Sequence, residues 1–186
     1  MSTANGILVA GIGNIFHSDD GFGSEVARLL LAGPPVPEGV RIVDYGIRGV
    51  HLAYDLLDGC DAAILIDATS QGGDPGTIYV IEPDVDAIET ENGLAEAGIV
   101  DAHGMDPASV LALLRSLGGS VERLLVVGCE PADVEDGMGL SEPVAGAVEE
   151  ACRVVRDLID QLLSPGDTPV PPGASRSQKT RKETLA

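Results

Sequence analysis

A glycine-rich turn near the start of the sequence constrains the fold more than any other stretch. Four consecutive apolar residues, Ile7 to Ala10, predict a buried strand, and the turn Gly11-Ile12-Gly13-Asn14 follows them directly. Two adjacent acids, Asp19 and Asp20, come next, before a helical pattern begins. A strand, a Gly-x-Gly turn and a helix in this order are typical of an α/β fold whose turn approaches a ligand closely.

The acids at this turn argue against a nucleotide site. A dinucleotide-binding turn would have its third glycine where Phe16 stands, and the helix N-terminus would receive a pyrophosphate. Two carboxylates there repel anions, whereas a helix N-terminus keeps carboxylates ionised, and ionised carboxylates bind cations. Alternatively, Ser18 or Asp19 only caps the helix, which leaves the second carboxylate unexplained. The turn therefore predicts a metal ligand.

The net charge narrows the class of partner. The 186 residues carry a net charge of −19, and because residues 164–186 hold four basic and two acidic residues, residues 1–163 carry −21. Every lysine lies in that last segment, so residues 1–163 have none to bind a phosphate. Nucleic acid and anionic membranes are poor partners for such a body, and a cation or a basic protein surface is a better one.

The apolar runs predict a single α/β domain over residues 1–163. Strand-like runs alternate with helical patterns, which indicates a three-layer α/β/α sandwich around a mostly parallel, twisted sheet of about five strands. The strand at Gly76–Ile81 follows the strand at Ala62–Ala68 too soon for a helical crossover, so we expect it to be antiparallel at a sheet edge. The Pro-, Ser- and Lys/Arg-rich composition of residues 164–186 predicts a disordered basic tail.

The cysteines and the apolar runs also bear on the compartment. Cys60, Cys129 and Cys152 are far apart and odd in number, so they support neither a disulfide framework nor a zinc site. No run approaches the roughly 18 apolar residues of a membrane span, and residues 1–6 lack the basic start of a signal peptide. We therefore expect a cytoplasmic protein with reduced, mostly buried thiols and no membrane partner.

Polar side chains follow directly on several of the predicted strands. These residues are Asn14, Asp44, Asp67 and Glu130. Because the carboxyl ends of parallel strands meet at one edge, we expect these side chains to gather there. Asp44 could instead cap the next loop, and Glu130 could belong to a turn before Pro131. Asp67 ends a continuous apolar run, where an unpaired carboxylate would be costly, so a functional role is favoured.

A long acidic stretch, residues 84–106, lacks a strong period and carries His103. Connections of this length in a compact domain are usually functional or mobile. Together these patterns predict a site of two carboxylates and one imidazole. His17 and His51 have no such setting, and we expect His51 at the exposed start of a helix. Neither the H-E-x-x-H zinc motif nor the Gly-x-Ser-x-Gly nucleophile turn is present.

The stretch Gly11 to Gly21, followed by Asp67-Ala68 and the later His103, resembles the hydrogenase maturation endopeptidases. The Gly-Leu-Ser sequence at residues 139–141, ahead of the last helical pattern, is similar to the same family, and the resemblance covers roughly residues 6–163. These proteases remove a C-terminal extension from the large-subunit precursor of nickel-iron hydrogenases after nickel insertion. The resemblance therefore implies a hydrolase whose partner is this precursor.

The resemblance also implies roles for particular residues. The metal-site positions fall on Asp20, Asp67 and His103, which would also be the catalytic residues, and Asp44 matches a further acid used for substrate or metal. Asn14 would support the site. Some members have Glu where this chain has Asp20, which leaves Asp19 open as the ligand. The nickel is expected to arrive with the substrate, and whether it takes part in the chemistry or only docks the precursor stays open.

Two rival functions share parts of this pattern. A nucleotide-dependent oxidoreductase would account for the α/β pattern and the Gly-x-Gly turn, although the missing third glycine and the acidic helix start count against it. A non-catalytic assembly chaperone would bind the nickel-loaded precursor without cutting it. Only a cleavage assay separates this chaperone from a protease.

Overall fold

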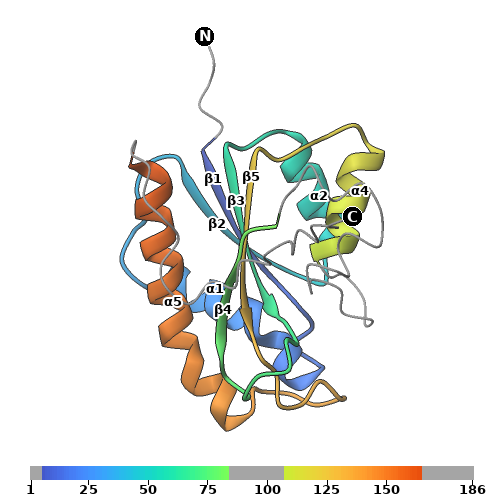
Figure 1. Cartoon of the computed structure of the whole chain (residues 1–186), viewed down its shortest axis with the longest axis vertical. Coiled ribbons are helices and arrows are strands. Elements are labelled where there is room, and N and C mark those ends of the chain that lie inside the picture. The colour runs from blue at the N-terminus through green and yellow to red at the C-terminus, as the bar shows by residue number, and fades with distance from the viewer. Residues whose placement is uncertain (1–5, 84–106, 165–186) are drawn as a thin grey trace, which may run out of the picture.

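The computed structural model describes residues 6–83 and 107–164, which form a sheet covered by helices on both faces (Figure 1). The strands are β1 (Ile7–Ile12), β2 (Val40–Gly46), β3 (Ala62–Ala68), β4 (Ile78–Ile81) and β5 (Arg123–Cys129). The helices are the 3-10 helix η1 (Ser18–Gly21) and the α-helices α1 (Phe22–Ala32), α2 (Gly49–Leu57), α4 (Pro107–Ser116) and α5 (Glu142–Leu163). The predicted three-layer sandwich is confirmed.

The five strands lie in the order β2-β1-β3-β5-β4. The first four are parallel, and β4 runs antiparallel to β5 at the edge of the sheet, as its short connection predicts. The partner of β4 is β5 rather than β3, the strand that precedes it in the chain, with Ile78 beside Cys129. The connection 69–77 therefore passes over the carboxyl end of β5.

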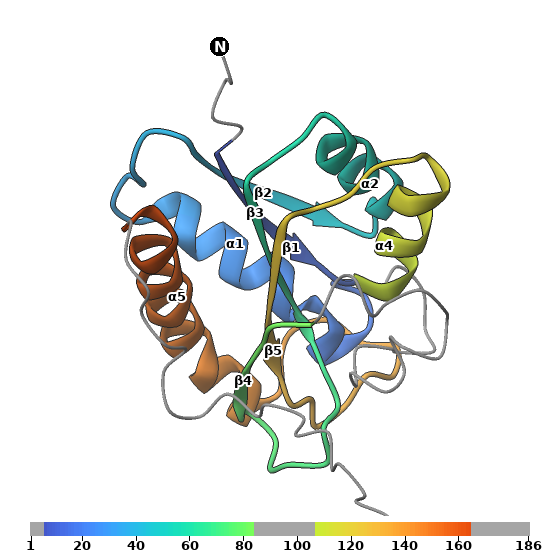
Figure 2. The ribbon, with the colours of Figure 1, turned by 45° about the horizontal axis from the view of Figure 1, so that its top comes forward.

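Side chains alternate between the two faces of the sheet. On one face, Ile7 and Val9 of β1 pack with residues of α1 and α5, and on the other, Leu8 and Ala10 pack with residues of α2 and α4. Figure 2 shows the same two pairs of helices on opposite sides of the strands. Both β1 and β3 are buried along their whole length, and apart from Asp67 all of their residues are apolar, as expected for strands covered by helices on both faces.

The glycines at the start of α1 allow the helix to lie against the sheet. A Cβ at Gly23 would lie 2.1 Å from the carbonyl oxygen of Ile66 and 2.2 Å from that of Ile12. A Cβ at Gly11 would lie 2.3 Å from the carbonyl oxygen of Gly23. These glycines thus serve the close packing of α1 on β1 and β3.

The chain order changes direction between β1 and β3, beyond whose carboxyl ends a site is expected. From β1 the chain moves through α1 to β2 on one side, and from β2 it returns through α2 to β3 on the other side of β1. Adjacent parallel strands whose connections leave in opposite directions form the point where open α/β sheets bind ligands. Within residues 6–83 and 107–164, no helix is long and apolar enough to cross a membrane.

Candidate active site

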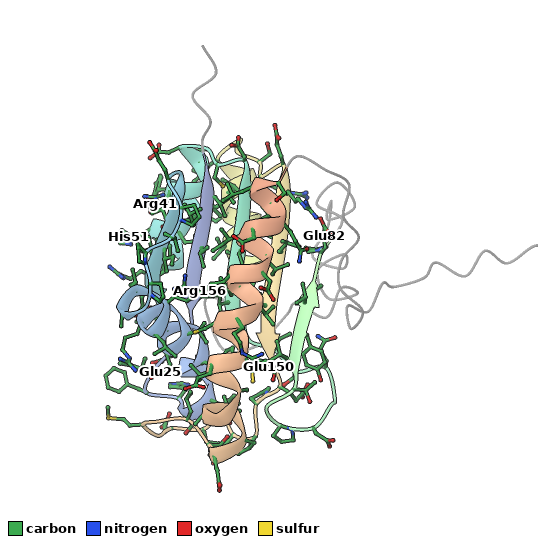
Figure 3. All side chains as sticks on the ribbon, turned by 90° about the vertical axis from the view of Figure 1, so that its left-hand side faces the viewer. Glu25, Arg41, His51, Glu82, Glu150 and Arg156 are labelled. Atoms are coloured by element: carbon green, nitrogen blue, oxygen red, sulfur yellow. The ribbon has the colours of Figure 1, made fainter. Side chains whose placement is uncertain are left out.

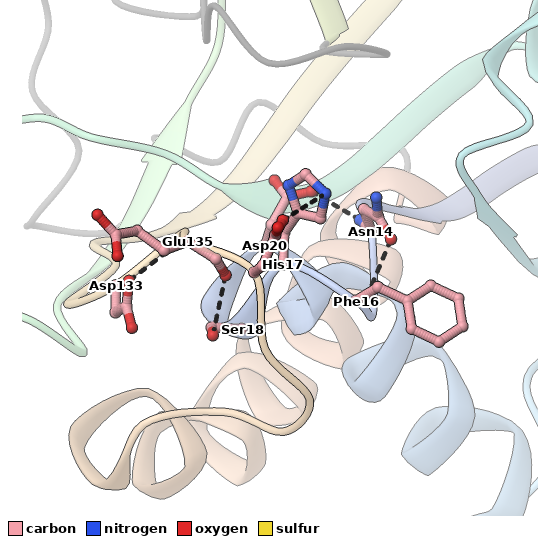
Figure 4. A network of polar contacts seen from close by, with 8 residues as sticks. Asn14, Phe16, His17, Ser18, Asp20, Asp133 and Glu135 are labelled. Atoms are coloured by element: carbon pink, nitrogen blue, oxygen red, sulfur yellow. Dashed lines mark hydrogen bonds and ion pairs between the residues drawn. The ribbon is translucent and has the colours of Figure 1, made fainter.

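The turn after β1 carries Asp20 back over the end of that strand. The backbone N–H of Asn14 donates to Asp20 Oδ2 at 2.7 Å, which ties the two ends of the turn together (Figure 4). Gly13 has φ +130°, a conformation that residues with a side chain rarely adopt, and a Cβ there would lie 1.8 Å from the Asp20 carbonyl oxygen. Position 13, the second glycine of Gly-x-Gly, therefore has to be glycine because the backbone of Asp20 lies against it.

Asp67 reaches the same glycine from the neighbouring strand. It is the next-to-last residue of β3, with only 5% of its surface exposed, and its Oδ1 accepts a hydrogen bond of 2.9 Å from the N–H of Ala68. The same oxygen lies 3.7 Å from the position that a Cβ on Gly13 would take. The backbone of Asp20 and the carboxylate of Asp67 thus both border Gly13, and the carboxylate of Asp20 is held at the neighbouring Asn14, beyond the carboxyl ends of β1 and β3.

Two carboxylates from separate elements can provide part of the oxygen ligands of a divalent ion. Across residues 6–83 and 107–164, no group of three His, Cys, Asp or Glu side chains is arranged to hold a metal. His103, the third predicted ligand, lies outside the described residues. The ligand set Asp20, Asp67 and His103 therefore stays a prediction, and the described chain supplies two of its three members.

Asp19 has a different role from that of its neighbour. Its side chain is fully buried, and it accepts hydrogen bonds at 2.6–3.0 Å from the N–H groups of Ala132, Asp133 and Ser141 and from the Ser141 hydroxyl. Burial by itself raises the pKa of this carboxyl, but these four hydrogen bonds outweigh it, and the pKa is held below the usual 3.8. Asp19 is a structural anchor, which favours Asp20 as the ligand.

The helix-cap interpretation of Ser18 and Asp19 is wrong. The helix α1 begins at Phe22 after Gly21, and no side chain caps either η1 or α1. Ser18 instead joins a backbone ladder with the loop 131–141: its N–H donates to Gly137 O at 2.9 Å, and its hydroxyl donates to Glu135 O at 3.1 Å (Figure 4). These partners are more than a hundred residues away, so local sequence carries little signal of them.

The other two strand-end acids also have partners. Asp44 Oδ1 accepts hydrogen bonds from the hydroxyl of the buried Ser24 at 2.8 Å and from Gly46 N–H at 3.0 Å. Within residues 6–83 and 107–164, no donor contacts Asp44 Oδ2, and Asp44 lines an open groove between α1 and α5. The loop-capping contact, which the sequence left open as an alternative, is therefore present, and a role of Asp44 toward substrate or metal stays a prediction. Ser24 was not foreseen, because a helical serine has no distinctive spacing.

Glu130 holds the connection that crosses the end of β5. It is 6% exposed, and its carboxylate accepts hydrogen bonds from the N–H of Gln71 at 2.7 Å, the N–H of Gly72 at 3.3 Å and the Tyr79 hydroxyl at 3.0 Å. The turn explanation of this residue is the one that the structure supports. Two loops beyond the carboxyl ends of the strands are thus each held by one buried carboxylate. Asp19 holds the loop 131–141, and Glu130 holds the connection 69–77.

The two described histidines are not among the predicted ligands. His51 is exposed on α2, as expected, and Figure 3 labels it. His17 lies in the turn itself, where its backbone is hydrogen-bonded to Asn14 and Asp20. His17 Nε2 lies 3.6 Å from Asp136, a residue whose side chain is 98% exposed. None of these observations points to catalysis.

Comparisons with known proteins agree with the geometry. A family model described as hydrogenase maturation protease matches residues 25–158. The hydrogenase expression/formation protein HoxM of Azotobacter vinelandii is 34% identical over 158 residues, which cover 84% of this chain and 73% of HoxM. HupD of Rhizobium leguminosarum is 34% identical over 172 residues, which cover 89% of this chain and 82% of HupD.

Solved structures lead to the same group of proteins. The hydrogenase maturating endopeptidase HybD of Escherichia coli superposes with a TM-score of 0.67 at 27% identity, over 85% of this chain and 94% of HybD. The solution structure of an endopeptidase from Escherichia coli superposes with a TM-score of 0.69 at 29% identity, over the same shares of the two chains. With the family model matching well over half of its length, this chain belongs to the hydrogenase maturation protease family, whose members are endopeptidases.

Proposed function

We propose that this endopeptidase removes the C-terminal extension of a nickel-iron hydrogenase large-subunit precursor, and that it acts on the precursor after nickel insertion. The observation that carries the proposal is that the turn Gly13-Asn14 lies beside both acids beyond the carboxyl ends of β1 and β3: Asn14 N–H donates to the Asp20 carboxylate, and the Asp67 carboxylate lies next to Gly13. Family membership supports the reaction class and the precursor as substrate. The metal dependence rests on the chemistry of the two carboxylates.

In this proposal, Asp20, Asp67 and His103 are the residues that hold the metal. Asp20 is held by Asn14 N–H and Asp67 by Ala68 N–H, so each presents carboxylate oxygen from a rigid element. Together with His103 they would bind the nickel that the precursor carries, leaving coordination positions for the ligands of the substrate itself. Nickel held there would supply a Lewis acid able to polarise a carbonyl or activate water, or would serve only to dock the precursor.

The setting of the proposed reaction is the cytoplasm, and the support for it comes from the cysteines. Cys60, Cys129 and Cys152 are all free thiols. Burial raises the pKa of Cys129 to about 12 and that of Cys60 to about 11, so both stay protonated and unreactive at neutral pH. Free thiols of this kind are typical of a reducing compartment.

The chaperone alternative shares this surface, and a cleavage assay separates the two. Purified protein is incubated with nickel-loaded and with metal-free precursor, and the size of the large subunit is followed by mass spectrometry. We expect the loaded precursor to lose its extension and the metal-free precursor to stay intact. Binding without cleavage would establish a chaperone, and equal cleavage of both forms would contradict metal-gated recognition.

A further inference from the structure

An open groove of about 670 Å³ lies between α1 and α5, with one end beside η1. Ile15, Ser18 and Gly21 line its end beside η1, and Asp44 lies on the β2 side. Its other walls come from α1, from the first turns of α5 and from the loop that ends at Leu140. Figure 3 shows α1 and α5 side by side, with Glu25 and Glu150 labelled. The groove thus reaches Asp44 and Gly21, the residue that follows Asp20 in the chain.

The chemistry of the groove is apolar and acidic. Its apolar side chains include Leu29 of α1, Val148 of α5 and Met138 of the loop before α5. Met138 is 76% exposed. Among its acids, Glu25 is already paired, because Arg28 Nε donates to its Oε2 at 2.9 Å. Asp44 and Glu149 also line the groove, and neither forms an ion pair with a described residue. The groove therefore carries two uncompensated negative charges between apolar walls.

We propose that this groove binds the C-terminal extension of the precursor as an extended segment that carries apolar side chains and at least one basic side chain. The inference rests on the proposed function, which supplies the kind of partner, while charge complementarity and continuity with Gly21 and Asp44 supply the place. A volume of about 670 Å³ is in the ~300–1,000 Å³ range of pockets that enclose a small ligand, so it admits a short extended chain and excludes a folded domain.

The first two turns of α5 provide matched positions for a test. Ala145 and Glu149 are exposed, lie four residues apart on one helix face and line the groove. Gly146 and Glu150 are also exposed and also lie four residues apart, on the next face of the helix, and neither lines the groove. A Cβ at Gly146 would meet no atom within 4 Å. Ala145→Trp should therefore fill the groove, whereas Gly146→Trp should point its ring elsewhere.

The probe is a fluorescein-labelled, metal-free synthetic peptide with the extension sequence of the precursor from the same organism. Its binding is measured by anisotropy, with circular dichroism as a check of folding. We expect Ala145→Trp to weaken binding at least about tenfold, since bulk in a site excludes its ligand, and Gly146→Trp to leave it unchanged. Glu149→Gln should weaken binding about two- to fivefold at low salt, the scale of exposed ion pairs, and Glu150→Gln should not.

The outcomes separate the groove from the reaction. Equal binding to the parent and to folded Ala145→Trp, or no binding to the parent, would overturn the groove proposal. A parent protein that binds the peptide through the groove but never cleaves the nickel-loaded precursor would overturn the proposed function and leave the groove standing. Equal effects of Glu149→Gln and Glu150→Gln would contradict the basic side chain in the extension.

Discussion

The 3-10 helix η1 joins two regions with opposite properties through two adjacent aspartates. On one side, Asp19 is fully buried and holds the loop 131–141 with hydrogen bonds from three backbone N–H groups and one hydroxyl. On the other side, Asp20 is half-buried, and its carboxylate accepts a hydrogen bond from the Asn14 N–H at the turn beyond the carboxyl end of β1. The protein encloses the Asp19 carboxylate completely, whereas Asp20 lies in a partly exposed position.

The difference shows how a pair of identical residues can separate stability from chemistry. A buried carboxylate surrounded by donors is satisfied by the protein and has little left for a ligand. A carboxylate at a crevice keeps the capacity to bind a cation. We therefore expect substitutions at Asp19 to affect folding and substitutions at Asp20 to affect the reaction, and the predictions below test this division.

The largest expected effect on stability is that of Asp19→Ala. It leaves the N–H groups of Ala132, Asp133 and Ser141 without their acceptor in a buried place, which should cost about 3–5 kcal/mol of the free energy of unfolding. Asp20→Ala removes the partly buried hydrogen bond from the Asn14 N–H and should cost about 1 kcal/mol. Urea unfolding followed by circular dichroism measures both, and equal losses would remove the distinction.

Gly13→Ala should have the next largest effect. A Cβ at this position would lie 1.8 Å from the Asp20 carbonyl oxygen, in a backbone conformation of φ +130°, so the turn must move at a cost of about 2–4 kcal/mol. Gly72→Ala is the control, because Gly72 also has positive φ, +80°, but a Cβ there meets no atom within 4 Å. Gly72→Ala should lower the free energy of unfolding by only about 1 kcal/mol. Similar thermal shifts for both variants would show that the Gly13 turn tolerates displacement.

Fold and site were predictable from the sequence to different degrees. The apolar runs and the strand-end acids placed Asp20 and Asp67 at one edge, because parallel strands impose that edge on any residue that ends them. The anchoring role of Asp19 could not be foreseen, since its donors come from residues 132–141, far along the chain. The partner of β4 was equally hidden, because spacing fixes the direction of a short connection but not which strand it reaches.

A smaller effect is expected from pH. Because the pKa of Asp19 is lower in the folded protein than the usual 3.8, its contribution to stability is complete well above pH 3.8 and is lost as the pH falls through the folded value. The difference in unfolding free energy between the parent and Asp19→Asn should therefore shrink on acidification from neutral pH to below the folded pKa of Asp19, which lies under 3.8. A difference that stays constant over this range would show that the charge of Asp19 is not what holds the loop.

The most direct test of the division is to measure cleavage and stability together in Asp19→Asn and Asp20→Asn. Cleavage of nickel-loaded precursor is expressed per folded molecule, with the unfolding free energy of each variant from urea titration. We expect Asp20→Asn to lose about a hundredfold or more in rate with a stability change within about 1 kcal/mol. Asp19→Asn should lose about 2–3 kcal/mol of stability and keep its rate within about threefold. The account would be contradicted if Asp20→Asn cleaved at the parent rate. It would also be contradicted if folded Asp19→Asn lost about a hundredfold or more in rate.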